Sequence, residues 1–347
     1  MTRDLAAEVS AALPVSVLTG ALGSGKTTLL NRLLEHPALG ETAVVINEFG
    51  EVGLDHLLVR HVSETVVLLD SGCLCCTVRG DLVTALRDLF LRRVRGEVPE
   101  FRRLVIETSG LADPAPVLHT LISDPLIGAR YRLDGVIATV DAVHAGAQLS
   151  RQPETRKQVA VADRIVLTKT DLAAPDAVED LRARLRELNP AAPTAVAIGG
   201  NVSPDLLFEA GLFSTRGKLP DVARWLNEEA YHGHHHAHGS IQSFCLTFAE
   251  PLDWEPFAAS LERLIAERGE DLLRVKGILN VAGEDRPLAV HGVQHLFHPP
   301  TPLPGWPDGD RRSRIVFITR DLGRDAVAAA ISPDRGGGGT RGGGIPA

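Results

Sequence analysis

The stretch VSVLTGALGSGKTTLLNRLL, residues 15–34, joins an apolar, β-rich segment to a glycine-rich turn and then to a helical pattern. The turn fits the phosphate-binding pattern G-x-x-x-x-G-K-[ST] in its required setting, after a strand and before a helix. Glycines let backbone N–H groups face bound phosphates, the lysine supplies positive charge to the β- and γ-phosphates, and a threonine hydroxyl can ligate magnesium. A chance glycine-rich turn is the alternative. We expect a nucleotide-phosphate and Mg²⁺ site formed by Gly20, Gly23, Ser24, Gly25, Lys26, Thr27 and Thr28.

Short apolar segments separated by amphipathic ones continue along the chain, which is typical of strands that alternate with helices. The expected strands lie at residues 43–46, 66–69, 104–106, 135–140 and 164–168. The prediction is an α/β fold, with a mostly parallel sheet of the P-loop NTPase type and helices on both of its faces.

A length of 347 residues suggests one large and one smaller domain. A second run of strand and helix patterns follows a histidine-rich break, with strands expected at 241–248, 272–281, 288–297 and 314–319 and a helix at 254–267. We expect a flexible N-terminus (1–13), a P-loop domain (14–229), a histidine-rich linker (230–239), a smaller α+β domain (240–333) and a disordered glycine-rich tail (334–347).

The composition excludes several classes of function. Lys plus Arg is 36 and Asp plus Glu is 44, so the net charge is 36 − 44 = −8, and nucleic acid is a poor candidate partner. No apolar run is long enough to span a membrane, and acids near the start argue against a signal peptide. We therefore expect a cytoplasmic protein without a membrane partner.

The segment Glu107-Thr108-Ser109-Gly110 ends a predicted strand, where ligands bind in open α/β sheets. Glu107 is the candidate catalytic acid beside Lys26, because a carboxylate there can hold a magnesium-bound water or polarise the attacking water. Gly110 would let the backbone approach the γ-phosphate. The alternative for Glu107 is a solvated glutamate at a strand end.

Another strand leads into Thr168-Lys169-Thr170-Asp171, at the place where guanine-specific P-loop proteins carry N-K-x-D. Asp171 can accept hydrogen bonds from the N–H groups of guanine, a pattern that adenine does not offer, and the Lys169 stem can cover the base. GTP is therefore favoured over ATP. Thr168 replaces the asparagine and removes an amide contact, so a chance K-x-D sequence in a loop stays open.

Three of the four cysteines fall within four positions, at Cys73, Cys75 and Cys76. Adjacent Cys75 and Cys76 would form a strained disulfide, whereas three thiolates on one turn can share a soft ion such as zinc. Three ligands leave one position of a tetrahedral site open. The alternatives are small buried hydrophobic residues or a redox trio.

Two further segments are candidate metal ligands. Glu48 lies in a candidate nucleotide-sensing loop at 47–55 and is either an additional ligand or an exposed acid. Five histidines within residues 232–238 could wrap a transition metal, or could form a solvated linker. Cys245 alternates with apolar residues and is expected in the core.

Five motifs occur in this order: GALGSGKTTLL (20–30), NEFGEVGLD (47–55), SGCLCC (71–76), ETSG (107–110) and TKTD (168–171). With them the chain resembles the CobW family of P-loop GTPases, relatives of the nickel-insertion GTPases of urease and hydrogenase maturation. The resemblance continues through LLRVKGILNVAG (272–283) and RRSRIVFITRDL (311–322).

The resemblance implies a GTP-hydrolysing metallochaperone that delivers zinc, or cobalt, to a client metalloprotein. It assigns the metal to Cys73, Cys75 and Cys76, the phosphates to residues 23–28, and the base to Lys169 and Asp171. One alternative is a client-specific accessory GTPase, for cobalamin synthesis or nitrile hydratase activation. Another is a metal-buffering protein, and homo-oligomerisation stays open.

Overall fold

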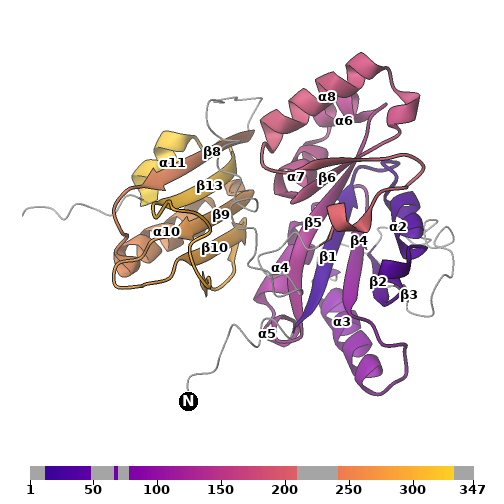
Figure 1. The fold of residues 1–347 in the computed structure, drawn as a ribbon, viewed down its shortest axis with the longest axis horizontal. Coiled ribbons are helices and arrows are strands. Elements are labelled where there is room, and N and C mark those ends of the chain that lie inside the picture. Colours follow the sequence, from indigo (N-terminus) through magenta and orange to yellow (C-terminus); the bar gives the residue numbers. More distant parts are fainter. Residues whose placement is uncertain (1–11, 48–65, 69–77, 209–240, 332–347) are drawn as a thin grey trace, which may run out of the picture.

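The computed structural model describes residues 12–47, 66–68, 78–208 and 241–331. Its first part is a seven-stranded, wholly parallel sheet in the order β3-β2-β4-β1-β5-β6-β7 (Figure 1). The strands are β1 (Leu13–Gly20), β2 (Thr42–Asn47), β3 (Val66–Leu68), β4 (Arg103–Thr108), β5 (Tyr131–Asp141), β6 (Arg164–Thr168) and β7 (Thr194–Ala197). The helices are α2 (Lys26–Leu34), α3 (Val78–Val94), α4 (Ala115–Ser123), α5 (Pro125–Gly128), α6 (Ala145–Arg151), α7 (Pro153–Val161) and α8 (Pro175–Leu188).

Both faces of this sheet are buried, because successive strand residues point to opposite sides and both sides are apolar. On one face, Val45 and Ile106 pack in a core that includes residues of α3, α4, α7 and α8. On the other face, Val44 and Val105 pack against leucines of α2. The predicted α/β fold with helices on both faces is confirmed.

The second part is an antiparallel sheet that carries two helices on one face. Strands β11-β10-β9-β13-β8 are neighbours in this order, and β12 pairs with β10. The strands are β8 (Ile241–Phe248), β9 (Arg274–Leu279), β10 (Leu288–Val293), β11 (Leu296–Phe297), β12 (Thr301–Pro302) and β13 (Ser313–Arg320), and the helices are α10 (Trp254–Arg268) and α11 (Arg324–Ile331).

One sequence-based element is corrected by the structure. Residues 288–297 were expected as a single strand, but β10 and β11 form a hairpin, and Gln294 in its turn has a positive φ of 54°. The expected boundaries at 229/230 and 239/240 lie outside the described residues, as do the N-terminal residues 1–11 and the glycine-rich tail. No helix in the described ranges is long and apolar enough to cross a membrane.

The sheet face that α10 and α11 leave uncovered packs against the first part of the chain. Four of its apolar residues belong to the same core cluster as the parallel sheet, namely Ile241, Leu273, Val293 and Ile318. Asp163, which directly precedes β6, forms buried ion pairs with Arg274 at 2.9 Å and Lys276 at 2.6 Å. Apolar and ionic contacts therefore join the two sheets.

Candidate nucleotide site

The phosphate loop connects β1 to α2 at the carboxyl edge of the parallel sheet. Gly25 precedes the helix with φ 90°, a left-handed conformation that a side chain would disfavour. Lys26 opens the helix and is buried, and its Nζ donates to the carbonyls of Gly20 at 3.0 Å and Ala21 at 3.2 Å. A positive charge is thereby held inside the loop where phosphates bind.

Neighbouring strands fix the loop from below. The hydroxyls of Ser24 and Thr139 share a hydrogen bond of 2.6 Å, which ties the loop to β5. The Thr168 hydroxyl donates to the Ser24 carbonyl at 2.8 Å, which ties it to β6. All three side chains are buried, so these two buried hydrogen bonds hold the phosphate loop against β5 and β6.

Thr27 and Glu107, 80 positions apart in sequence, meet at the same edge. The Thr27 hydroxyl donates to Glu107 Oε1 at 2.8 Å, and the Glu107 side chain is buried at the end of β4. A hydroxyl oxygen and a carboxylate side by side are ligands that suit magnesium, which binds through few protein groups and keeps several waters. The two side chains therefore fit Mg²⁺: Thr27 would be a direct ligand, and Glu107 would accept from a metal-bound water.

Gly110 lies against the phosphate loop itself. A Cβ atom at this position would lie 2.5 Å from the Leu22 backbone nitrogen and 2.6 Å from its Cα. The lack of a side chain thus lets the loop after β4 pack directly on the loop after β1. The close approach of the Gly110 backbone to the γ-phosphate, expected from the sequence, stays a prediction.

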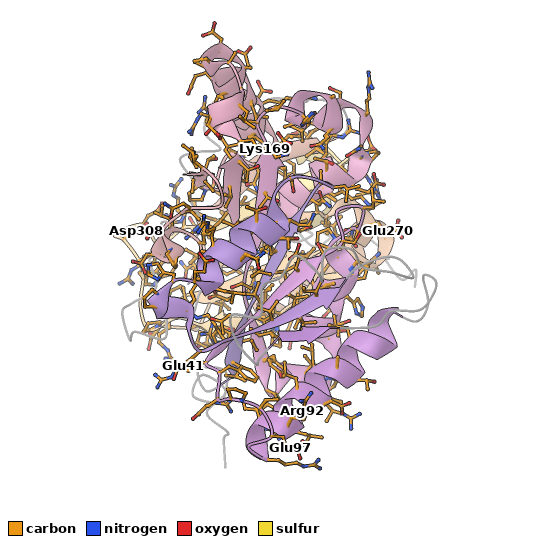
Figure 2. All side chains as sticks on the ribbon, turned by 90° about the vertical axis from the view of Figure 1, so that its right-hand side faces the viewer. Glu41, Arg92, Glu97, Lys169, Glu270 and Asp308 are labelled. Atoms are coloured by element: carbon orange, nitrogen blue, oxygen red, sulfur yellow. The ribbon has the colours of Figure 1, made fainter. Side chains whose placement is uncertain are left out.

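Lys169 follows the carboxyl end of β6, while Glu41 precedes the amino end of β2, so these two labelled residues mark opposite ends of the parallel sheet (Figure 2). Lys169 has a positive φ of 56°. Its Nζ donates to the carbonyl of Gly23 in the phosphate loop at 2.8 Å and to Asp141 at 2.7 Å. Asp171 is exposed two residues further on, and its contact with a guanine base stays a prediction.

Several candidate residues lie outside the described part of the chain: Glu48, Cys73, Cys75, Cys76 and the histidines of 232–238. The strand before Glu48 is β2 and the strand before the cysteines is β3. These two strands are parallel neighbours, with Ile46 of β2 opposite Leu68 of β3. Among the described residues, no group of three or more His, Cys, Asp or Glu side chains could hold a metal ion. Cys245 is half-buried beside an apolar cluster that contains Ile278 and Val316, as expected of a core residue.

Sequence reasoning missed Asp141, Thr139 and Asp163. Asp141 ends β5, and its position at a carboxyl strand end was a signal that could have singled it out. Thr139 lies in an apolar run, and nothing in its neighbours indicates contact with Ser24. Asp163 has partners more than a hundred positions away, so its role depends on the tertiary structure.

The fold and this site define a P-loop nucleotide-binding protein. Residues 14–196 match the CobW/HypB/UreG nucleotide-binding domain, and residues 241–332 match the cobalamin synthesis protein cobW C-terminal domain. The chain therefore belongs to the CobW family.

Similar proteins extend over nearly the whole chain. It is 37% identical over 327 residues to the zinc chaperone YjiA of Escherichia coli (strain K12), covering 92% of this chain and 98% of that protein. It is 30% identical to the zinc chaperone CobW of Sinorhizobium sp, covering 92% and 96%. The crystal structure of Zn(II)-bound YjiA GTPase from E. coli matches with a TM-score of 0.68 and 32% identity, covering 92% and 98%.

Proposed function

We propose that this protein is a GTP-hydrolysing metallochaperone that binds zinc through Cys73, Cys75 and Cys76 and delivers it to a client metalloprotein in the cytoplasm. One observation carries the proposal: the phosphate loop and the Thr27–Glu107 pair lie at the carboxyl edge of the same sheet at which β3 ends, directly before the cysteine segment. Zinc is preferred to cobalt because relatives that match almost the full chain are named zinc chaperones.

We propose that Lys26, Thr27 and Glu107 support GTP hydrolysis at this site. Lys26 supplies charge to the β- and γ-phosphates, and Glu107 orients water beside the Thr27 hydroxyl. Thr27 would hold magnesium, which would supply positive charge at the phosphates. Asp171 selects guanine through its N–H groups, and the Lys169 stem covers the base.

The nucleotide would control the metal through the segments that follow β2 and β3. GTP with magnesium would order residues 48–55 and 70–76 and would complete the thiolate site, with Glu48 as a further candidate ligand. Hydrolysis removes these differential contacts and weakens zinc binding, so that the client can take the ion. Both segments lie outside the described residues.

The test is a titration of zinc and cobalt into metal-free protein, with and without magnesium and a non-hydrolysable GTP analogue. The cobalt–thiolate charge-transfer band reports the ligands. We expect the analogue to tighten metal binding. Indifference to the analogue would contradict coupling and favour a metal buffer.

Replacing Cys73, Cys75 and Cys76 by serine should abolish tight metal binding and spare GDP affinity. The matched control is Cys245→Ser, which alters a thiol in the other sheet and should leave the charge-transfer band unchanged. Metal affinity that survives the triple replacement would refute the assigned site.

A further inference from the structure

Asp141 is a buried carboxylate at the edge of the candidate nucleotide site. Only 2% of its side chain is exposed. Its Oδ1 accepts from the backbone N–H groups of Val143 at 2.8 Å and His144 at 3.3 Å, so the turn after β5 fixes the orientation of the carboxylate. A charged group is rarely buried unless it is paired, which raises the question of what this carboxylate holds.

The second oxygen of Asp141 faces Lys169, the lysine of the segment proposed to bind guanine. Oδ2 accepts from Lys169 Nζ at 2.7 Å and from the ring Nδ1 of His144 at 2.9 Å. Burial alone would raise the pKa of the Asp141 carboxyl, but hydrogen bonds from Lys169 and His144 hold that pKa below its usual range. The carboxylate therefore stays ionised as the counter-charge of Lys169.

Lys169 is held at its tip and strained at its backbone. The same Nζ that meets Asp141 also donates to the Gly23 carbonyl, so one ammonium bridges the loops after β5, β6 and β1. The positive φ of 56° is costly for a lysine and persists only where the surroundings enforce it. The two short charge-assisted hydrogen bonds of Nζ help to hold Lys169 in this conformation.

We propose that Asp141 is a positioning residue for guanine-nucleotide binding: it fixes the Lys169 ammonium against the Gly23 carbonyl, so that the lysine stem is preorganised over the base and the base loop is locked to the phosphate loop. This inference rests on the base site assigned above to Lys169 and Asp171. A preorganised side chain loses less conformational entropy when the ligand binds. Asp141 thus acts through Lys169 and touches no part of the nucleotide.

A double-mutant cycle on GDP affinity tests the proposal, with Asp141→Asn, Lys169→Ala and both together. Asparagine keeps an oxygen for the Val143 amide and removes the charge. We expect Asp141→Asn to weaken GDP binding about tenfold, because one charge-assisted contact is lost. In the Lys169→Ala background the same change should have less than about a twofold effect, since its target is gone. Turnover at saturating GTP should change far less than affinity.

The outcomes separate the two claims. If Lys169→Ala itself leaves GDP affinity unchanged, the proposed base site is wrong. If Lys169→Ala weakens binding but Asp141→Asn does not, or if the two losses simply add, the positioning role is wrong. The matched control is Asp271→Asn, which alters a carboxylate paired with Arg268 at the end of α10, in the C-terminal part of the chain, and should not change GDP affinity.

Thermal unfolding of each variant checks that the fold is intact. Should Asp141→Asn fold poorly, Asp141→Ser keeps a short acceptor in the turn, and the same cycle applies with the same expected coupling.

Discussion

Contacts to neighbouring strands and loops fix the positions of individual side chains at this site. Thr168 stands where an asparagine was expected, and its hydroxyl donates to the Ser24 carbonyl of the phosphate loop. This hydrogen bond ties the end of β6 to the phosphate loop. The threonine side chain has no amide group with which to contact a base. Glu107 is likewise fixed by its partner Thr27, whose hydroxyl donates to Oε1; its proposed role in ordering water at the phosphates stays a prediction.

Glu107→Gln should slow GTP hydrolysis by about tenfold or more and leave GDP affinity within a few-fold, because the amide oxygen still accepts from Thr27 while the negative charge is lost. Single-turnover hydrolysis and GDP titration measure the two quantities. Glu35→Gln, which alters an exposed partner of Arg32 on α2, is the control and should change neither. Equal losses of turnover and affinity would contradict the role of Glu107.

The strands and their loops act together because the sheet is parallel. The carboxyl ends of β1, β4, β5 and β6 lie side by side, and the loops that follow them meet in one place. One close approach is that of Gly110 to Leu22, where the loop after β4 touches the backbone of the phosphate loop. This contact leaves no room for a side chain, and any substitution must displace one loop.

Gly110→Ala should therefore reduce the free energy of unfolding by about 1–3 kcal/mol through overpacking and should weaken GTP binding through a displaced phosphate loop. Urea unfolding and GTP titration provide the measurements. The control is Gly146→Ala in α6, where a Cβ meets nothing within 4 Å and alanine favours the helix. An unperturbed Gly110→Ala protein would mean that this contact is not tight in solution.

The two sheets form one body through an interface that combines apolar packing with buried charge. Asp163 is paired with Arg274 and Lys276, and it also accepts from the Val136 backbone N–H of β5 at 3.0 Å. Burial would raise the pKa of the Asp163 carboxyl, but the charges of Arg274 and Lys276 hold it well below its usual range. Removing one partner of such a pair leaves uncompensated charge, at a cost of about 3–5 kcal/mol.

Beside these cations, the rings of His291 and His298 stack at 3.9 Å. Burial, and then the charge of Arg274, lowers the pKa of His298 to about 4 from 6.5. As the pH falls below 6.5 the unfolded chain takes up a proton at His298, whereas the folded protein does not until about pH 4. Stability is therefore fully present above pH 6.5 and is lost as the pH falls through this window.

Between pH 7 and pH 5 we expect the lowered pKa of His298 to reduce the free energy of unfolding by about 1–2 kcal/mol. Urea unfolding at each pH measures this change. His298→Gln should reduce this dependence without abolishing it, because burial also lowers the pKa of the stacked His291. His36→Gln, at an exposed histidine, should leave the dependence unchanged. The same pH dependence in the His298→Gln protein would show that another group carries it.

The sequence by itself determined the parallel α/β fold and the glycine-rich loop between its first strand and helix, because these depend on local signals: apolar periodicity and glycines at fixed spacing. An acid at a strand end also singled out Glu107, whose catalytic role stays a prediction. It also predicted β8, β9, β13 and α10 within a few residues, but it missed β12, α11 and the hairpin turn at Gln294. The metal and base assignments at Cys73, Cys75, Cys76 and Asp171 stay predictions.

Only the tertiary structure brought Asp141 to Lys169, Thr168 to Ser24, and Asp163 to Arg274 and Lys276. These contacts join residues 28 to 144 positions apart, as the Lys169–Asp141 and Thr168–Ser24 pairs illustrate. A single sequence carries no signal for the partner of a buried charge, because the energy that fixes the pair comes from removing both groups from water together. That energy exists only once the strands have been packed.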